Sequence, residues 1–163
     1  MKNKIIDNST FEKRPWKIVI IVSRFNEIIS KRLLEGALAI LKKYNVKEED
    51  IGIIWIAGAW EISLIAQEVA ATKKWDAVLT LGTIIQGETL HHEYLAQAIS
   101  NGLMQVSLNE KIPIGFGILT VKNLEQALAR AGDISQNKGA EAAFHVLETL
   151  SVLTQISRLP DPS

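Results

Sequence analysis

From residue 17 onward, hydrophobic positions follow two alternating patterns. Four largely apolar runs, over 17–22, 51–56, 76–81 and 113–119, are typical of strands that are buried on both faces. The intervening segments place apolar residues at helical spacing or, at Asn123 and Gln126, open with a capping box, which predicts helices over 29–41, 61–71, 93–108, 123–131 and 137–156. Strands that alternate with helices predict an α/β fold with a parallel sheet and right-handed crossovers.

The two ends of the chain lack this periodicity. Residues 1–16 are polar and mixed, which predicts an N-terminal arm that is loose or docks on another surface. Residues 157–163 contain Pro160 and Pro162 and predict a C-terminal tail. Because no linker, repeat or low-complexity tract separates the elements between them, we expect residues 1–163 to form a single domain.

The composition of the chain argues against several classes of protein and several kinds of binding or catalytic site. With 163 residues, 47% of them hydrophobic, the chain is long enough and apolar enough for one globular core. The formal net charge of zero gives no basic footprint for nucleic acid or an anionic membrane. The chain has no cysteine, which excludes disulfides, thiolate zinc sites and cysteine nucleophiles. No apolar run reaches the length of about 20 residues that spans a bilayer, and no secretory signal precedes the first strand. We therefore expect a cytoplasmic protein.

Function is expected at the carboxyl ends of the predicted strands, where parallel α/β sheets bind their ligands. These ends are the segments 23–26, 57–61, 82–92 and 120–123. They carry no GxGxxG dinucleotide motif, no P-loop and no GxSxG nucleophile motif, and they lack the carboxylates of a phosphorylated receiver domain. The three histidines of the chain, of which two are adjacent, do not form a metal site by spacing.

The segment 82–92, predicted as a loop, carries the richest chemistry. Its glycines allow close approach of a ligand to the backbone, and Thr89 lies near a predicted helix start, a natural place for a phosphate. His91 or His92 can transfer protons near neutral pH. A helix start with a capping threonine and two solvated histidines explains the same residues, and composition alone favours this structural interpretation.

The other strand ends offer weaker candidates, each with a structural alternative. Phe25 can stack on a flat heterocycle or pack against the following helix. Trp60 and Glu61 can contact and hydrogen-bond a ligand, although an acidic residue is also favoured at a helix start. Arg130 and Lys138 can bind an anion together or lie separately on the surface as solvated charges.

Taken together, these segments form seven motifs in a fixed order, and in that order and spacing the chain resembles the lumazine synthase family over about residues 17–153. The motifs are Ser23-Arg-Phe-Asn26, Gly58-Ala-Trp-Glu-Ile62, Gly87-x-Thr-x-His91, Pro113-Ile-Gly-Phe-Gly-Ile-Leu-Thr120, Leu124-Glu-Gln-Ala127, Arg130-Ala-Gly132 and Asn137-Lys-Gly-x-Glu-Ala-Ala143.

The resemblance implies a flavodoxin-like, three-layer α/β/α sandwich with a central parallel sheet, assembled into homopentamers that stay free, pair or close into an icosahedral shell. It also implies the condensation of 5-amino-6-(D-ribitylamino)uracil with 3,4-dihydroxy-2-butanone 4-phosphate to 6,7-dimethyl-8-ribityllumazine. This is the penultimate step of riboflavin biosynthesis, and the resemblance implies that it needs no metal or organic cofactor.

The resemblance further implies a role for each matching residue. Proton transfer falls on His91 rather than His92. The pyrimidine and its ribityl chain are expected to contact Phe25, Ala59, Trp60, Glu61, Ile84, Ile85 and Phe116, and the phosphate to contact Glu88, Thr89, Arg130 and Lys138. In the family, the residues matching Phe116, Arg130 and Lys138 come from the neighbouring subunit.

Four positions depart from the family pattern. Ala57 and Ser63 stand where proline is common, Gln86 replaces an arginine before Gly87, and Ile134 replaces a lysine. The last two changes are expected to weaken binding of the phosphorylated substrate without removing activity. Two alternatives on the same fold remain, namely a non-catalytic shell-forming protein and a flavin-binding module.

Overall fold

The computed structural model describes residues 4–7 and 14–162, and within them four parallel strands form one sheet. The strands are β1 (Ile18–Ser23), β2 (Ile51–Ile56), β3 (Ala77–Ile85) and β4 (Ile114–Val121), in the spatial order β2-β1-β3-β4. Because β2 and β3 lie on opposite sides of β1, the direction of winding reverses there. The carboxyl ends of β1 and β3 therefore form the topological switch point of the sheet.

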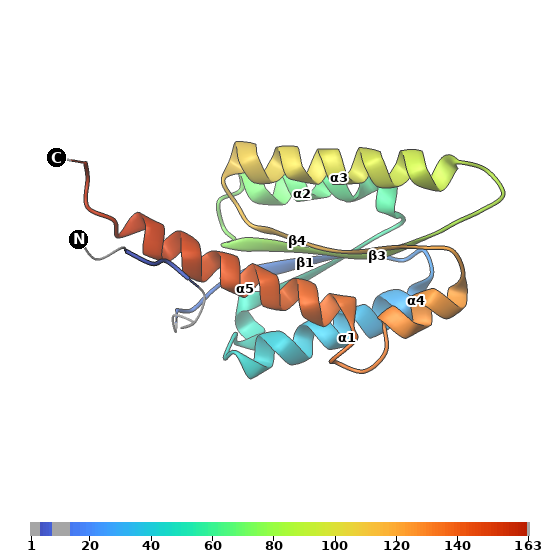
Figure 1. The fold of residues 1–163 in the computed structure, drawn as a ribbon, viewed down its shortest axis with the longest axis horizontal. Coiled ribbons are helices and arrows are strands. Elements are labelled where there is room, and N and C mark those ends of the chain that lie inside the picture. Colours follow the sequence, from blue (N-terminus) through green and yellow to red (C-terminus); the bar gives the residue numbers. More distant parts are fainter. Residues whose placement is uncertain (1–3, 8–13, 163) are drawn as a thin grey trace.

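Helices cover both faces of this sheet (Figure 1). On one face lie α1 (Glu27–Lys43), α4 (Leu124–Arg130) and α5 (Lys138–Ser157). On the other lie α2 (Ile62–Ala71) and α3 (His91–Glu110), and two short 3₁₀ turns, Glu48–Asp50 and Ala59–Glu61, precede β2 and α2. The predicted three-layer α/β/α fold with a parallel sheet is confirmed.

The core has two parts, because both faces of the sheet are covered. Along β1, Ile18, Ile20 and Val22 join the cluster under α1 and α5, whereas Val19 and Ile21 join the cluster under α2 and α3. All six residues of β1 are buried. This double burial is why the strand is a continuous apolar run rather than an alternating one.

The segment 82–92, predicted as a loop, is largely regular structure. The third strand continues from the predicted end at residue 81 to Ile85, because Gly82 to Ile85 pair in register with Ile118 to Val121 of β4. The following helix begins at His91, two residues before the predicted start. Only residues 86–90 connect the two elements, so this prediction was wrong over most of the segment.

Two asparagine side chains cap helices, and the cap at Asn123 confirms a prediction from the sequence. Asn123 accepts a hydrogen bond from the amide of Gln126 at 2.9 Å and caps α4. Asn137 caps α5, since its Oδ1 accepts from the amide of Ala140 at 3.0 Å. The Nδ2 atom of the same side chain donates to the carbonyl oxygens of Arg32 and Gly132, at 2.9 and 3.3 Å. Asn137 therefore ties the start of α5 to α1.

Only parts of the two predicted chain ends lie within the described residues. Residues 4–7 and 14–16 of the arm form no helix or strand. Trp16 packs against the core cluster under α1 and α5, and the carbonyl of Asp7 accepts a hydrogen bond from Nε2 of Gln155 at 2.6 Å. Residues 158–162 follow the end of α5 without regular structure. No helix in the described part of the chain is long and apolar enough to cross a membrane.

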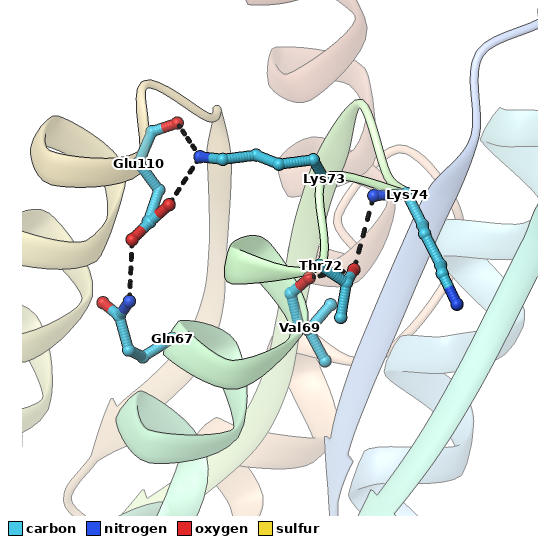
Figure 2. Close-up of polar contacts among 6 residues, drawn as sticks. All are labelled: Gln67, Val69, Thr72, Lys73, Lys74 and Glu110. Carbon is cyan, nitrogen blue, oxygen red and sulfur yellow. Dashed lines mark hydrogen bonds and ion pairs between the residues drawn. The ribbon is translucent and has the colours of Figure 1, made fainter.

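An ion pair joins Lys73, just after the C-terminal end of α2, to Glu110, the last residue of α3 (Figure 2). Nζ of Lys73 lies 2.6 Å from Oε2 of Glu110, and Nε2 of Gln67 donates to the other carboxylate oxygen at 2.8 Å. These hydrogen bonds, the one from Lys73 first, lower the pKa of Glu110 below its usual value. The folded state is therefore stabilised when the Glu110 carboxylate is ionised.

The pH dependence of stability is expected to show this contribution. Because the pKa of Glu110 is lower in the folded than in the unfolded state, the stabilisation is present above the unfolded value of about 4.3 and is lost as the pH falls through the folded value. Urea midpoints of wild type and Glu110→Gln should differ at neutral pH and converge in acid. Glu68→Gln, which alters a carboxylate without an ion pair among the described residues, is the control. A difference in urea midpoint between wild type and Glu110→Gln that stays constant with pH would contradict the role of Glu110.

Candidate active site

A cavity of about 590 Å³ opens at the switch point of the sheet. Its walls are the turn after β1, the segment 57–61, the end of β3 and the first turns of α3. These are three of the four strand ends at which the sequence predicted function. The volume lies in the usual range for sites that bind small molecules.

Phe25 forms one wall of the cavity and is 63% exposed. The turn that carries it is held by a hydrogen bond from the amide of Arg24 to the carbonyl of Ile56, at 2.8 Å, and by Asn26 in the left-handed region with φ 57°. The Arg24 guanidinium lies over the Trp55 ring at 5.2 Å. An exposed aromatic face held by a fixed turn is suited to stacking on a flat ring.

The segment 57–61 forms the adjoining wall. Ala59 is buried, while Trp60 is 69% exposed, and both line the cavity together with Glu61. Residues 59–61 form a 3₁₀ turn and α2 begins at Ile62, so Glu61 lies before the helix rather than inside it as predicted. A Cβ atom at Gly58 would lie 3.3 Å from the Glu61 carboxylate, which shows how closely that carboxylate approaches the backbone.

The end of β3 and the turn after it form the floor. Ile84 and Ile85 line the cavity as predicted for ring contacts, and so does Thr89. Oγ1 of Thr89 accepts a hydrogen bond from the amide of His91 at 3.4 Å, which closes the turn at the start of α3. Glu88 is exposed, and its side chain is not part of the cavity wall.

Both adjacent histidines line the cavity, but their surroundings differ. The side chain of His92 is 11% exposed, and its Nδ1 lies 3.1 Å from the carbonyl oxygen of Thr89. His91 is exposed, and its ring makes no hydrogen bond with any residue that the structure describes. The imidazole of His91 is therefore available to a ligand, whereas that of His92 is engaged with the turn.

The residues that the resemblance assigns to a neighbouring subunit, Phe116, Arg130 and Lys138, lie away from this cavity. Phe116 and Lys138 line a separate cavity of about 350 Å³ at the β4 edge, between α3 and α5. Nζ of Lys138 pairs with the Glu141 carboxylate at 2.7 Å. Arg130 lies in the last turn of α4, where its Nη1 donates to the carbonyl of Gln126 at 3.4 Å, and it lines neither cavity. Within one chain, the two groups do not share a site.

Sequence reasoning missed Thr83 and Leu95 among the residues that line the first cavity, and it considered His92 but assigned proton transfer to His91. Leu95 lies one helical turn after His91. A helix predicted to begin at His91 would therefore have placed Leu95 on the same side of the helix as His91. Residue 83 was assigned to a loop, so the sequence did not indicate that Thr83 lies on β3. The described residues contain no cluster of three or more histidine, aspartate or glutamate side chains that could hold a metal ion.

The family model for 6,7-dimethyl-8-ribityllumazine synthase matches residues 15–154. The chain belongs to this family. The resemblance carried by the seven motifs is thereby confirmed, over nearly the same residues. Lumazine synthases are transferases of riboflavin biosynthesis that act on small molecules. The matched range includes all four strands, the cavity at the switch point and the second group at β4 and α5.

Proposed function

We propose that the protein condenses 5-amino-6-(D-ribitylamino)uracil with 3,4-dihydroxy-2-butanone 4-phosphate to 6,7-dimethyl-8-ribityllumazine, releasing phosphate and water. The observation that supports this most directly is the convergence of Phe25, Glu61 and His91 on one cavity in a chain of the lumazine synthase family. An aromatic face, a carboxylate and an imidazole are the groups that a planar, polyhydroxylated amine needs for binding and proton transfer.

Each wall of the cavity has a role in this proposal. The pyrimidine stacks on Phe25 and packs against Ile84 and Ile85, while the Glu61 carboxylate accepts hydrogen bonds from ribityl hydroxyls. Ala59 and Trp60 hold the same substrate. The amine attacks the carbonyl of the butanone, and His91 moves protons during Schiff-base formation, loss of phosphate and ring closure. Holding the two reactants together supplies much of the rate enhancement.

Binding the phosphate of the butanone substrate needs positive charges, which the described lining of this cavity lacks. Among the described residues that line it, none is lysine or arginine. The turn of Glu88 and Thr89 offers backbone amides at the start of α3, where anions are favoured. We propose that Arg130 and Lys138 of a neighbouring subunit supply the positive charge, and that Phe116 of that subunit completes the ring pocket.

Such sharing requires that identical subunits associate, and a closed ring gives one shared site at each interface. Met104, Leu108 and Phe116 are exposed apolar side chains on α3 and the adjacent edge strand β4, and they offer a surface for a neighbour. We propose that residues 1–163 act as one domain, with arm 1–16 and tail 157–163, in a homopentamer that is free or part of a larger assembly. The proposed reaction uses no metal or organic cofactor, and we place it in the cytoplasm.

Arg130→Ala is expected to raise KM for the butanone phosphate. A lost charge-assisted contact to phosphate is worth about 1.5–3 kcal/mol, or about 10- to 150-fold. Gln86 and Ile134 are uncharged and cannot compensate. Steady-state kinetics with each substrate varied in turn measure this effect, with Arg130→Lys retaining part of the affinity and Lys122→Ala as a control for general charge. Equal increases for both substrates would argue against a phosphate contact.

The alternatives of a non-catalytic shell protein and a flavin-binding module are decided by one assay. The purified protein is incubated with both substrates, and formation of lumazine is followed by its fluorescence. Bound flavin alone does not discriminate, since a site for a ribityl lumazine can also hold a flavin. A folded, assembled protein without turnover would refute the proposed reaction.

A further inference from the structure

The turn that carries Phe25 is held from outside the cavity by the side chain of Arg24. The Arg24 guanidinium lies over the ring of Trp55, 5.2 Å from its centroid, and Trp55 belongs to the neighbouring strand β2. Neither Arg24 nor Trp55 is among the residues that line the cavity, whereas Phe25, the next residue along the chain, forms one of its walls. Arg24 therefore supports this wall without being part of it.

The turn over residues 24–26 has few other contacts that fix its direction. The amide of Arg24 donates to the carbonyl of Ile56 at 2.8 Å, which extends the pairing of β1 with β2 by one step. Asn26 has φ 57°, in the left-handed region, and its Nδ2 atom finds no hydrogen-bond partner among the described residues. Because a non-glycine residue is strained in this conformation, contacts of its neighbours must hold the turn.

Of the two charged-group contacts of Arg24, the one with the ring is the better anchor. Nη1 of Arg24 lies 3.9 Å from Oε1 of Glu27, and both side chains are about half exposed. The same Glu27 oxygen lies 3.1 Å from Nζ of Lys31, so this carboxylate is shared. A long, exposed ion pair contributes little, whereas a guanidinium over an aromatic ring fixes a direction as well.

We propose that Arg24 is a positioning residue for the aromatic wall: by lying over Trp55, it holds the turn so that the ring of Phe25 keeps the orientation that stacks on a flat heterocycle. The identity of the heterocycle, a pyrimidinedione, rests on the proposed function. Phe25 is 63% exposed, so its own packing does little to fix its ring. A support that orders the ring before the ligand arrives lowers the ordering cost of binding.

Arg24→Met removes the charge and keeps most of the length of the side chain. The affinity for the pyrimidine substrate and for the lumazine product should fall about 2- to 5-fold, the range of a cation–π contact at an exposed site. KM for the butanone phosphate should not change. Arg24→Lys should retain part of the affinity, because an ammonium can also lie over the ring. Calorimetric titration with the pyrimidine and fluorescence titration with the product measure these effects.

A double-mutant cycle tests whether the effect passes through Phe25. In a Phe25→Ala background, Arg24→Met should cause no further loss of affinity, because the ring that Arg24 positions is absent. The same loss in both backgrounds would show that Arg24 acts on the ligand directly, and would overturn the proposal.

Arg14→Met is the matched control. The Arg14 guanidinium lies over the ring of Trp16 at 4.9 Å, before β1, and neither residue lines the cavity. This variant therefore loses the same kind of contact and should keep the wild-type affinity for both ligands. Thermal unfolding without ligand is measured for both variants. A purely structural Arg24 would behave like Arg14, with an altered melting temperature at most and unchanged affinity, and that result would overturn the proposal.

The outcome is separable from that of the proposed reaction. Turnover by wild type with unchanged binding in Arg24→Met refutes the positioning role and leaves the reaction standing. Binding of the pyrimidine that depends on Arg24 through Phe25, without turnover, supports the positioning role and refutes the reaction. A wild-type protein that binds neither the pyrimidine nor the lumazine refutes both.

Discussion

Replacing His91 by alanine is expected to lower kcat by about 10²–10⁴-fold, the usual contribution of a positioned acid or base. The imidazole lines the cavity at the first residue of α3, is exposed, and is not engaged by any other described side chain. Because the role proposed for His91 is to move protons rather than to hold substrate, KM should change far less than kcat. The pH profile of kcat should lose the limb that depends on this group.

His92→Ala is the matched control for this prediction. Its ring also lines the cavity, but Nδ1 lies 3.1 Å from the carbonyl of Thr89, so we expect it to support the turn after β3. Its loss should act mainly on KM for the phosphorylated substrate. A larger fall in kcat for His92→Ala than for His91→Ala would move the proton-transfer role to His92.

Mixing two variants that are each nearly inactive at a low concentration of the butanone phosphate is expected to restore about a quarter of the active sites, if each site is shared between neighbours in a ring. His91→Ala and Arg130→Ala assemblies should each turn over slowly at a low concentration of the butanone phosphate. After joint unfolding and reassembly in equal amounts, some Arg130→Ala subunits, with His91 intact, will adjoin a His91→Ala subunit that supplies Arg130. The separation of the two residue groups within one chain is the reason for this expectation.

A second mixture provides the control. Wild type is reassembled with an equal amount of the double variant His91→Ala/Arg130→Ala. Shared sites require two wild-type neighbours, so about a quarter of sites should be active, whereas self-contained sites would leave about half. Native mass spectrometry verifies random mixing. Half activity in this mixture, with no recovery in the first, would show that each chain carries a complete site.

Local features of the chain were readable from the sequence because neighbouring residues control them. The run over 17–22 predicted β1 to within one residue at each end, since both faces of that strand are buried and Ile18 to Val22 are all apolar. The cap Asn123 was found because a side chain that accepts from an amide three residues later is a local interaction. The motif order was sufficient to indicate the family that the chain belongs to.

The predicted grouping of Phe25, Glu61 and His91 also follows from the sequence, through one general rule. In a parallel sheet, strand ends that are far apart along the chain meet at the same edge, so residues that follow β1, β2 and β3 converge. The separate location of Phe116 and Lys138 at the β4 edge depends on strand order and helix packing. Neither the strand order nor the helix packing can be derived from the hydrophobic pattern along the chain.

The course of the chain after residue 81 was decided by tertiary structure alone. Glycine and polar residues there favour a loop locally, but pairing of Gly82 to Ile85 with β4 extends the strand, and strand pairing is an interaction between segments that lie far apart in sequence. The same pairing buries Thr83 within the strand that forms the cavity floor. The seven motifs indicated the family, whereas only the packed sheet revealed that, among the described residues, the Thr80 hydroxyl finds a hydrogen-bond partner and the Thr83 hydroxyl does not, because a hydrogen bond depends on which distant atoms packing brings within reach.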